Sequence, residues 1–509
     1  MITIHLDGKR MEIGQGSTLG SILNGHPREC SVAIIRPVTQ EQAKTSSILI
    51  GTTSGQVTVE LGGGNVPDLE SPETAARLAI HWTDRSAAAF GPFPSGIRPA
   101  RKPHLYERDD VILGCGGYDP QRSYLIFSKS RHSADHGADE SGGVIGRVVS
   151  GRAVLDRWST GDRITKIEPV ISWADTSRSY TTRDMTIPLE DGMQVVTRVA
   201  ITAQGYTADA VTTEAATGVE HMLLGLKSER FVVGRATSTH ILDSRLAGTG
   251  EAPAEFRHPR REGVVTIRSS GPSAGGIYIY RTDVPSSMAH NIVGQVTGGI
   301  ELPKLARDDD IIAVTVQPAR IDLLGLPLSQ AKEIAAARGF TLTFDKDAGE
   351  RIVVSQDPGT TLEVLAGKKV AVNTAPYDKV IDIRLDDEKA PSSCEVFRRI
   401  TGLKEHDAGM LPVFFKFDDV VLFKPVIPVD VRLNPENTPV GEVPAAGLGI
   451  TNDSRKGAGM VGVRLSANSE FGPTSEPFEG TNMIGQVIDT EKIKKVKERE
   501  KVYVREVKR

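Results

Sequence analysis

The sequence predicts a multidomain protein of the mainly β class with some α+β structure. Its 509 residues are enough for about three or four domains, and 39 % apolar residues can supply several hydrophobic cores. The 51 glycines and 29 prolines exceed the usual combined share of about 12 %, and a glycine-containing apolar segment recurs three times along the chain. These features favour many short strands joined by turns over long helices.

Residues 1–53 predict a small module of two strands, a helix and a third strand. The strands Ile2–Leu6 and Arg10–Ile13 flank an Asp-Gly dipeptide that favours a tight hairpin. Ser17 is the expected N-cap of a short helix, and a strand at 31–36 follows. This order resembles the ubiquitin-like β-grasp fold, whose members are usually docking units.

The internal repeat is the most informative feature of the sequence. The segment Val144–Gly151 is matched by Ile292–Gly299, and a shorter third copy lies at Met483–Val487. A glycine inside an apolar strand marks a bulge, a bend or a close backbone approach. We therefore predict the same bend in three related β units, at the third position of each segment. These glycines are Gly146, Gly294 and Gly485.

The second copy carries further motifs of a known barrel. A Gly271-Pro272 loop leads into the strand Ile277–Tyr280, and His290 begins a His-x-x-x-Gly-x-Val strand. This order resembles the cyclophilin barrel, and the third copy resembles the minimal cyclophilin-like barrels of archaea and bacteria. The resemblance implies three cyclophilin-like β-barrel units, which we place at residues 54–168, 169–318 and 378–490.

A different unit is predicted at residues 319–377. An Ala-rich helix at Ser329–Arg338 ends at Gly339, a typical C-terminal cap. A Gln-x-Pro-Gly segment at Gln356–Gly359 follows a strand. This order resembles a PASTA domain, a small α+β module that serves for binding or spacing.

The C-terminal residues 491–509 are strongly basic. Nine basic and four acidic side chains give this segment a net charge of +5. Alternation at Val502–Val504 predicts an exposed edge strand that its charge keeps from aggregating. The alternative is a docking tail for an acidic partner.

The three cysteines do not form a recognisable metal motif. Cys30, Cys115 and Cys394 are far apart, and no Cys-x-x-Cys is present. Ordinary, partly buried thiols are the simplest interpretation. Cys115, in a Gly-Cys-Gly-Gly segment, is the candidate metal ligand, because it could lend one thiolate to an iron–sulfur cluster shared with a partner. No cofactor is expected in this chain alone.

Other patterns with catalytic potential have simpler explanations. His132 and His136 have a spacing that can bind metal on a helix, but their polar surroundings predict an exposed loop. Asp162 and the matching Asp310 predict a turn that recurs with the repeat. The Phe-His-Arg string on which cyclophilin activity depends is missing, and Phe256–His258 reverses its order. Without a nucleophile and base, we predict a scaffold and not an enzyme.

Charge and hydropathy restrict the location and the partners of the chain. The formal net charge of −4 argues against a broad nucleic-acid-binding face. The first residues do not have the pattern of a secretory signal, and no apolar run reaches the roughly 18 residues that span a bilayer. We expect a cytoplasmic protein that binds neither nucleic acid nor membranes.

Taken over nearly the whole chain, the order of modules resembles the methanogenesis marker protein 3 family. Matching segments are Gly62–Glu70, Ile292–Leu302, Gln356–Gly359 and Phe471–Thr474. The resemblance implies an archaeal methanogen and a non-catalytic scaffold or assembly subunit of the complex that activates methyl-coenzyme M reductase. The implied partners are other methanogenesis marker proteins, the activation ATPase and the reductase itself.

Two alternatives stay open at this point. The first is a folding factor related to peptidyl-prolyl isomerases. The second is an electron-transfer subunit that contributes a cysteine ligand to an iron–sulfur cluster.

Overall fold

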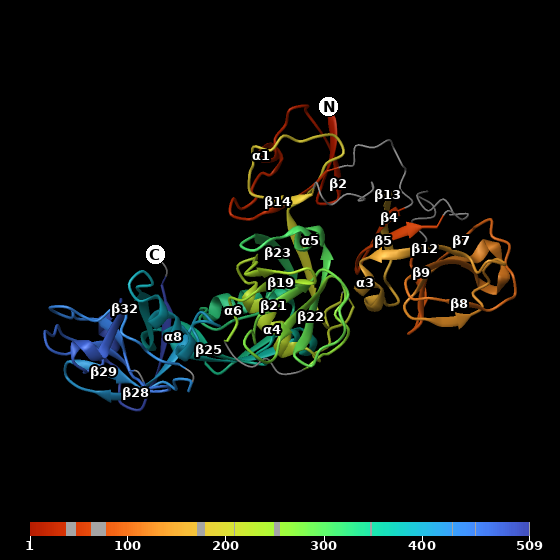
Figure 1. Ribbon diagram of the computed structural model, residues 1–509. Helices are drawn as coiled ribbons and strands as arrows, with labels where there is room; N and C mark the ends of the chain where they lie inside the picture. Colours follow the sequence, from red (N-terminus) through yellow and green to blue (C-terminus); the bar gives the residue numbers. More distant parts are fainter. Residues whose placement is uncertain are drawn as a thin grey trace. The chain divides into compact units, whose positions relative to one another are not determined.

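A computed structural model shows two compact units, Met1–Arg320 and Ile321–Arg509 (Figure 1). The structure describes residues 1–36, 47–62, 78–169, 179–207, 209–248, 255–346, 349–429, 431–453 and 455–507. Most of the predicted family segment 62–70 lies outside these residues. The many short strands agree with the predicted mainly β, multidomain class. No helix in the described part of the chain has the length and apolar character needed to cross a bilayer.

The N-terminal sheet begins with the predicted hairpin. Asp7 and Gly8 both have positive φ angles, 47° and 77°, as a tight two-residue hairpin turn requires. The short helix α1 (Leu19–Ile22) is present, but Thr18 and not Ser17 occupies its N-cap. In order across the sheet, the strands are β14 (Tyr180–Thr182), β3 (Val32–Ile35), β15 (Gln194–Val196), β1 (Ile2–Leu6) and β2 (Lys9–Ile13).

This sheet differs from the predicted module 1–53 in its strand content. β15 pairs in parallel with β1, with His5 opposite Gln194, and β14 pairs with β3. The strand β4 (Ser47–Thr52), placed inside the module by the sequence, belongs to the next sheet instead. The reason is that one hairpin and one strand leave backbone groups unpaired, and a distant segment supplies their partners.

The first glycine repeat lies in an eight-stranded sheet. Its strands, in order, are β13 (Ile164–Pro169), β4, β5 (Gly55–Leu61), β12 (Val144–Ser150), β9 (Asp110–Cys115), β10 (Ser123–Ser128), β7 (Ala87–Phe93) and β6 (Ile80–Thr83). An additional bridge between Ala79 and Arg163 ties its two end strands together. The helix α3 (Arg152–Arg157) follows β12, and β8 (His104–Tyr106) pairs with β11 (His132–Ala134) in a separate ribbon.

The second repeat lies in a sheet of the same design. Its strands, in order, are β17 (Arg230–Val232), β23 (Ile311–Gln317), β16 (Arg198–Ala203), β22 (His290–Gly298), β20 (Val264–Arg268), β21 (Ile277–Tyr280), β19 (His240–Asp243) and β18 (Arg235–Ala236). Two helices accompany it, α4 (Ala216–Gly225) and α5 (Glu301–Leu305). The Gly-Pro loop leads into β21, as the sequence predicts.

The second compact unit starts with a small α+β part. Its sheet contains β24 (Thr341–Phe344), β26 (Lys369–Pro376) and β25 (Arg351–Asp357), in that order. The helix α6 (Leu328–Arg338) ends at Gly339 with φ 70°, which confirms the predicted helix and its cap. The second helix, α7 (Thr361–Gly367), begins with the side chain of Thr360 accepting a hydrogen bond from the amide of Glu363.

The third repeat lies in a closed barrel, drawn in blue in Figure 1. Around the barrel the strands are β27 (Val380–Leu385), β32 (Thr481–Val487), β30 (Gly447–Thr451), β31 (Val461–Arg464), β29 (Val420–Phe423), β28 (Gly409–Lys416) and β33 (Lys501–Glu506). The helices α8 (Pro391–Thr401) and α9 (Thr490–Lys494) belong to this part. Inward-facing side chains of the strands and of α8 form one apolar core.

The prediction of an exposed edge strand at the C-terminus is wrong. β33 pairs in parallel with β27 and antiparallel with β28, so it is an interior strand of the barrel. Val502 and Val504 are 1 % and 2 % exposed. The alternation of apolar residues correctly indicated a strand, but the valine side chains point into the barrel core and the strand has a neighbour on each side. The boundary predicted at residue 490 therefore cuts through the barrel.

The three repeat glycines occupy the same place in their sheets. On one side, each glycine pairs with the last residue of the neighbouring strand, which is β5, β16 or β27. On the other side, the register of the strand pairing shifts by one residue. The pairs are Gly146–Leu61, Gly294–Ala203 and Gly485–Leu385. The shifted pairings are those of β12 with β9, β22 with β20 and β32 with β30. The predicted common bend is confirmed, and it is a β-bulge.

Candidate functional site

Cys115, the metal ligand suggested by the sequence, lies inside the first sheet. Its side chain is 5 % exposed, and its Sγ lies 3.4 Å from Ser123 Oγ. Burial raises the pKa of the Cys115 thiol, which disfavours the thiolate that a metal needs. Cys30 and Cys394 are also buried. No group of three metal-binding side chains is found among the described residues.

His132 and His136 do not lie in the exposed loop that the sequence predicts. Their Nε2 atoms are 3.0 Å apart, and the ring of Tyr106 contacts both imidazoles. Burial, together with the neighbouring His132, lowers the pKa of His136 to about 4. The sequence did not indicate the contact with Tyr106, because the residues around the histidines are polar. The contact arises from the pairing of β8 with β11, which places His132 opposite Tyr106. The two imidazoles and the Tyr106 ring form one aromatic cluster.

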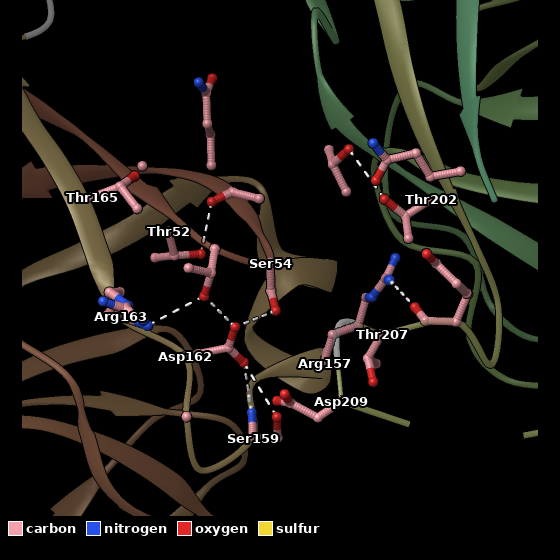
Figure 2. Close-up of a pocket in the computed structure, with 18 of the residues that line it drawn as sticks. Thr52, Ser54, Arg157, Ser159, Asp162, Arg163, Thr165, Thr202, Thr207 and Asp209 are labelled. Atoms are coloured by element: carbon pink, nitrogen blue, oxygen red, sulfur yellow. Dashed lines mark hydrogen bonds between the residues drawn. The ribbon is translucent and has the colours of Figure 1, made fainter. Parts of the chain in front are cut away.

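The repeated aspartates form a turn, as predicted. Asp162 accepts hydrogen bonds from Ser54 Oγ at 2.6 Å and from the amide of Ser159 at 2.9 Å (Figure 2). Asp310 accepts from the amide of Arg307 in the same way, at 2.8 Å. Their oxygens are therefore engaged in holding the turn that leads into β13 and β23, and they are poorly placed to act as general bases.

A polar cavity of about 510 Å³ lies beside this turn (Figure 2). It is lined largely by hydroxyl groups, including those of Thr52, Thr165, Thr202 and Thr207. Arg157, which faces it, donates to the backbone oxygen of Tyr206 at 3.3 Å. The lining contains no histidine or cysteine. The cavity can hold water or a polar ligand, but it offers no nucleophile with a base.

The C-terminal barrel exposes a group of aromatic side chains at the β28–β29 hairpin. Phe414, Phe415 and Phe417 are 37 %, 43 % and 53 % exposed. The rings of Phe414 and Phe415 lie 4.2 Å apart, and Phe415 lies 6.1 Å from Phe417. A β-bulge between Val413 and Phe415 breaks the alternation of the strand, so two successive rings face outward. Exposed aromatic groups of this kind mark protein-binding surfaces.

The basic C-terminal segment lies beside the same strand. The amide of Val413 donates to Glu500 O at 2.8 Å, and the amide of Arg499 donates to Val413 O at 3.1 Å. Lys497 and Arg499 are exposed. From the other side, Lys424 Nζ lies 4.9 Å from the centre of the Phe414 ring. The predicted docking tail is thus built into the barrel, next to the phenylalanines.

We call this surface the aromatic–basic rim. It consists of Phe414, Phe415, Phe417, Lys424, Lys497 and Arg499. Aromatic and arginine side chains contribute most of the binding energy in many protein interfaces. Surrounding cations favour a partner surface of negative charge. The rim can therefore bind a segment that carries both apolar and acidic side chains, and it contains no catalytic group.

Comparison with known proteins shows similarity along the whole chain. A UPF0288 protein of Methanosarcina barkeri is 38 % identical over 518 residues, which cover 99 % of this chain and 98 % of that protein. The chain belongs to the UPF0288 family. A UPF0288 protein of Methanothermobacter thermautotrophicus is 34 % identical over 99 % of this chain and 98 % of its own length. One of Methanopyrus kandleri is 30 % identical over 99 % of both.

The barrel of this UPF0288 protein also matches a domain family. Residues 381–507 match the family described as "Putative peptidyl-prolyl cis-trans isomerase domain". The matched region includes β33, in agreement with its place in the barrel. Among solved structures, an uncharacterized B. cereus protein is 16 % identical, covers 23 % of this chain and has a TM-score of 0.18. A similarity this low does not define the fold.

Sequence reasoning missed the rim of the UPF0288 chain. The positive charge of the C-terminal segment was recognised from the sequence. Its position beside β28 was not, because the hydrogen bonds between Val413 and residues 499–500 join positions about 85 residues apart. A useful indication was present in Phe414-Phe415-Lys416-Phe417, where three aromatic residues lie close together in a chain with only 14 phenylalanines. A strand with one buried face would be expected to alternate there.

Proposed function

We propose that this protein is a non-catalytic, partner-binding subunit whose aromatic–basic rim holds an acidic segment of another protein. The observation that carries the proposal is the joining of three exposed phenylalanines with the basic C-terminal segment on one barrel. Among the described residues, the cysteines are buried, His132 and His136 contact each other, and the repeated aspartates accept hydrogen bonds within their turns. None of these groups is arranged as a nucleophile with its base.

The energetics of the rim suit a reversible protein contact. Phe415 and Phe417 are about half exposed, and covering the remaining apolar area of such a ring contributes about 1 kcal/mol. The exposed cations add attraction over a distance, and this part falls as salt screens it. A partner segment with carboxylates on either side of apolar residues would use both components.

We further propose that the assembly is the machinery that activates methyl-coenzyme M reductase. Support comes from the methanogen relatives, which cover the full chain, and from the resemblance of its module order to the methanogenesis marker protein 3 family. The cyclophilin-like and β-grasp modules would then serve for docking. This proposal implies that the activation ATPase, the reductase and other marker proteins are its partners.

The test uses the full chain, affinity-tagged and expressed in a methanogen. The double variant Phe415→Ser/Phe417→Ser removes the two most exposed rings of the rim. Phe344→Ser is the matched control, because Phe344 is 36 % exposed and has Lys332 Nζ 4.5 Å from its ring centre, like Phe414 with Lys424. We expect wild type and control to co-purify with the reductase or the activation ATPase, and the double variant to lose them.

Two results would overturn the proposal. Retention of both partners by the double variant would mean that the rim does not bind them. A wild-type chain that elutes from native extract as a monomer would show that it is not a stable subunit.

A prolyl isomerase function is the second candidate, because the barrel matches the isomerase-related family. Proline isomerisation in cyclophilins depends on an accessible arginine. The barrel strands carry three arginines. Arg464, on β31, is 2 % exposed and pairs with Asp419. Arg505, on β33, pairs with Asp382, and Arg384, on β27, is half-buried. We therefore expect the purified chain to leave the cis–trans rate of a proline peptide unchanged in NMR exchange measurements. Acceleration that disappears in an Arg464→Lys variant would establish the isomerase instead.

A further inference from the structure

A second cavity, of about 320 Å³, lies on the sheet of the second repeat. It is distinct from the rim and from the cavity of Figure 2, and β18, β19, β20, β21 and β22 all contribute to it. The residues around it are Arg235, Thr237, Thr239, His240, Leu242, Arg260, Arg268, Ser273, Tyr278, Tyr280, Val284 and His290. The volume lies at the small end of the range of sites that bind organic molecules.

The floor of this cavity is aromatic and buried. Tyr278 and Tyr280 are 4 % and 2 % exposed, and His290 is 8 % exposed. The rings of Tyr278 and His290 meet edge to face with their centres 4.8 Å apart. His240 contacts both tyrosine rings, at 5.1 and 5.8 Å. Such a floor fits the flat or apolar part of a ligand.

The walls of the cavity are cationic. Arg260 donates from Nε to Pro285 O at 2.9 Å and from Nη1 to the hydroxyl of Tyr280 at 2.7 Å, which fixes its guanidinium group. Arg235 and Arg268 stand at the same cavity, whose lining has no aspartate or glutamate. Fixed guanidinium groups with remaining N–H donors bind carboxylates, phosphates and sulfonates well.

The two histidines are held neutral by their surroundings. Thr266 Oγ1 lies 3.0 Å from His290 Nδ1, and Thr239 Oγ1 lies 3.0 Å from His240 Nδ1. Burial, and then Arg260, Arg268 and His240, lower the pKa of His290 to about 4. Burial, and then Arg235, Arg260 and Arg281, lower the pKa of His240. An anion in the cavity would offset the positive charge and raise both pKa values.

The other two repeats have no such cavity floor at the equivalent positions. The comparison uses two residues in each repeat. The first is the residue of β9, β20 or β30 that pairs with the position two places before the repeat glycine. The second is the residue of β10, β21 or β31 that pairs with the first. In the second repeat these residues are Thr266 and Tyr278. In the first they are Ile112 and Ile126, and in the third Gly449 and Gly462. The aromatic and polar floor is therefore particular to the second repeat and is not a requirement of the shared fold.

We propose that the second repeat carries a binding site for a small organic anion, with its oxyanion group between Arg235, Arg260 and Arg268 and its apolar part on Tyr278 and Tyr280. The site is separate from the rim, so either one can fail without the other. Its ligand would be a cargo or an effector of the subunit, since the cavity holds no charged base to begin a reaction.

The test compares two probes on the full-length protein. Benzenesulfonate keeps its negative charge at any working pH, and benzenesulfonamide is its uncharged counterpart. We expect the sulfonate to bind about tenfold more tightly at pH 7. It should also shift the NMR signals of ¹³C-labelled His240 and His290, assigned by substitution. Its affinity should increase as the pH falls from 7 toward about 4, the pKa of His290 in the free protein, because the anion favours protonation of both imidazoles.

Variants locate the site on the molecule. In Arg235→Gln/Arg268→Gln we expect sulfonate affinity to fall about tenfold or more. The control Arg198→Gln, an exposed arginine of β16 outside the cavity, should bind like wild type. Equal affinity for the two probes would overturn the proposal, and so would full affinity in the double variant. The wild-type protein alone can also overturn it, if the sulfonate leaves both histidine signals unchanged at about 10 mM.

Discussion

Adding a side chain at the third repeat glycine should open the C-terminal barrel. Gly485 has φ +153°, and a Cβ there would lie 2.0 Å from Arg384 O. The corresponding distance is 2.5 Å from Glu60 O at Gly146 and 3.0 Å from Thr202 O at Gly294. Because all three neighbours are backbone atoms of a paired strand, none can move without disturbing its sheet.

The shorter the distance, the larger the expected loss in the free energy of unfolding. Gly485→Ala combines an unfavourable backbone angle, which costs about 1–3 kcal/mol, with displacement of β27, where lost hydrogen bonds cost about 1 kcal/mol each. We expect about 3 kcal/mol in total for Gly485→Ala, less for Gly146→Ala, and about 1 kcal/mol for Gly294→Ala, whose contact is the loosest.

Hydrogen exchange of the full chain measures these effects one sheet at a time. A loss of about 3 kcal/mol corresponds to roughly hundredfold faster exchange of the protected amides of β30 and β32 in Gly485→Ala. The amides of the second sheet should exchange at the wild-type rate in that variant. Gly96→Ala is the control, because a Cβ at Gly96 has no neighbour within 4 Å.

The interpretation of the repeat would be refuted by either of two results. One is unchanged exchange in the barrel of Gly485→Ala. The other is a loss of protection in Gly294→Ala as large as that in Gly485→Ala.

Three further predictions follow from the described contacts. A chain that ends at Glu500 loses β33, so proteolysis should degrade its barrel while the first compact unit stays resistant, and equal resistance of both would contradict the barrel closure. The pKa of His136, about 4, lies below the usual value of about 6.5. Between these two pH values, His136 is protonated in the unfolded chain and neutral in the folded chain. Thermal unfolding should show stability being lost as the pH falls from 6.5 to about 4, and His136→Phe should reduce this dependence. Finally, the three cysteines are buried and should react with a thiol reagent only after denaturation. Rapid labelling of Cys115 in the native protein would contradict its burial and would support a role as a metal ligand.

Local features of the fold were predictable from the sequence. The Asp-Gly turn, the helix ending at Gly339 and the bulge at Gly146, Gly294 and Gly485 each depend on a few neighbouring residues with strong conformational preferences. The repeat also located the turn at Asp162, because the same hydrogen bonds recur wherever the same backbone path recurs.

Long-range pairings were not predictable in the same way. Nothing near His5 indicates that Gln194 will lie opposite it, and the valines of β33 do not specify which core they will enter. The two cavities and the rim depend on such pairings. The alternating Tyr278 and Tyr280 were visible in the sequence. His290 reaches them only through the register of β20, β21 and β22, and Arg260 only through its bridge to Val284.

The most direct test of the proposed function is a cryo-electron microscopy structure of the complex isolated with the tagged full chain from a methanogen. We expect an acidic segment of a partner protein to cover Phe415 and Phe417 and to lie within ion-pairing distance of Lys497 or Arg499. A complex in which these four side chains face solvent, with every partner bound elsewhere, would contradict it.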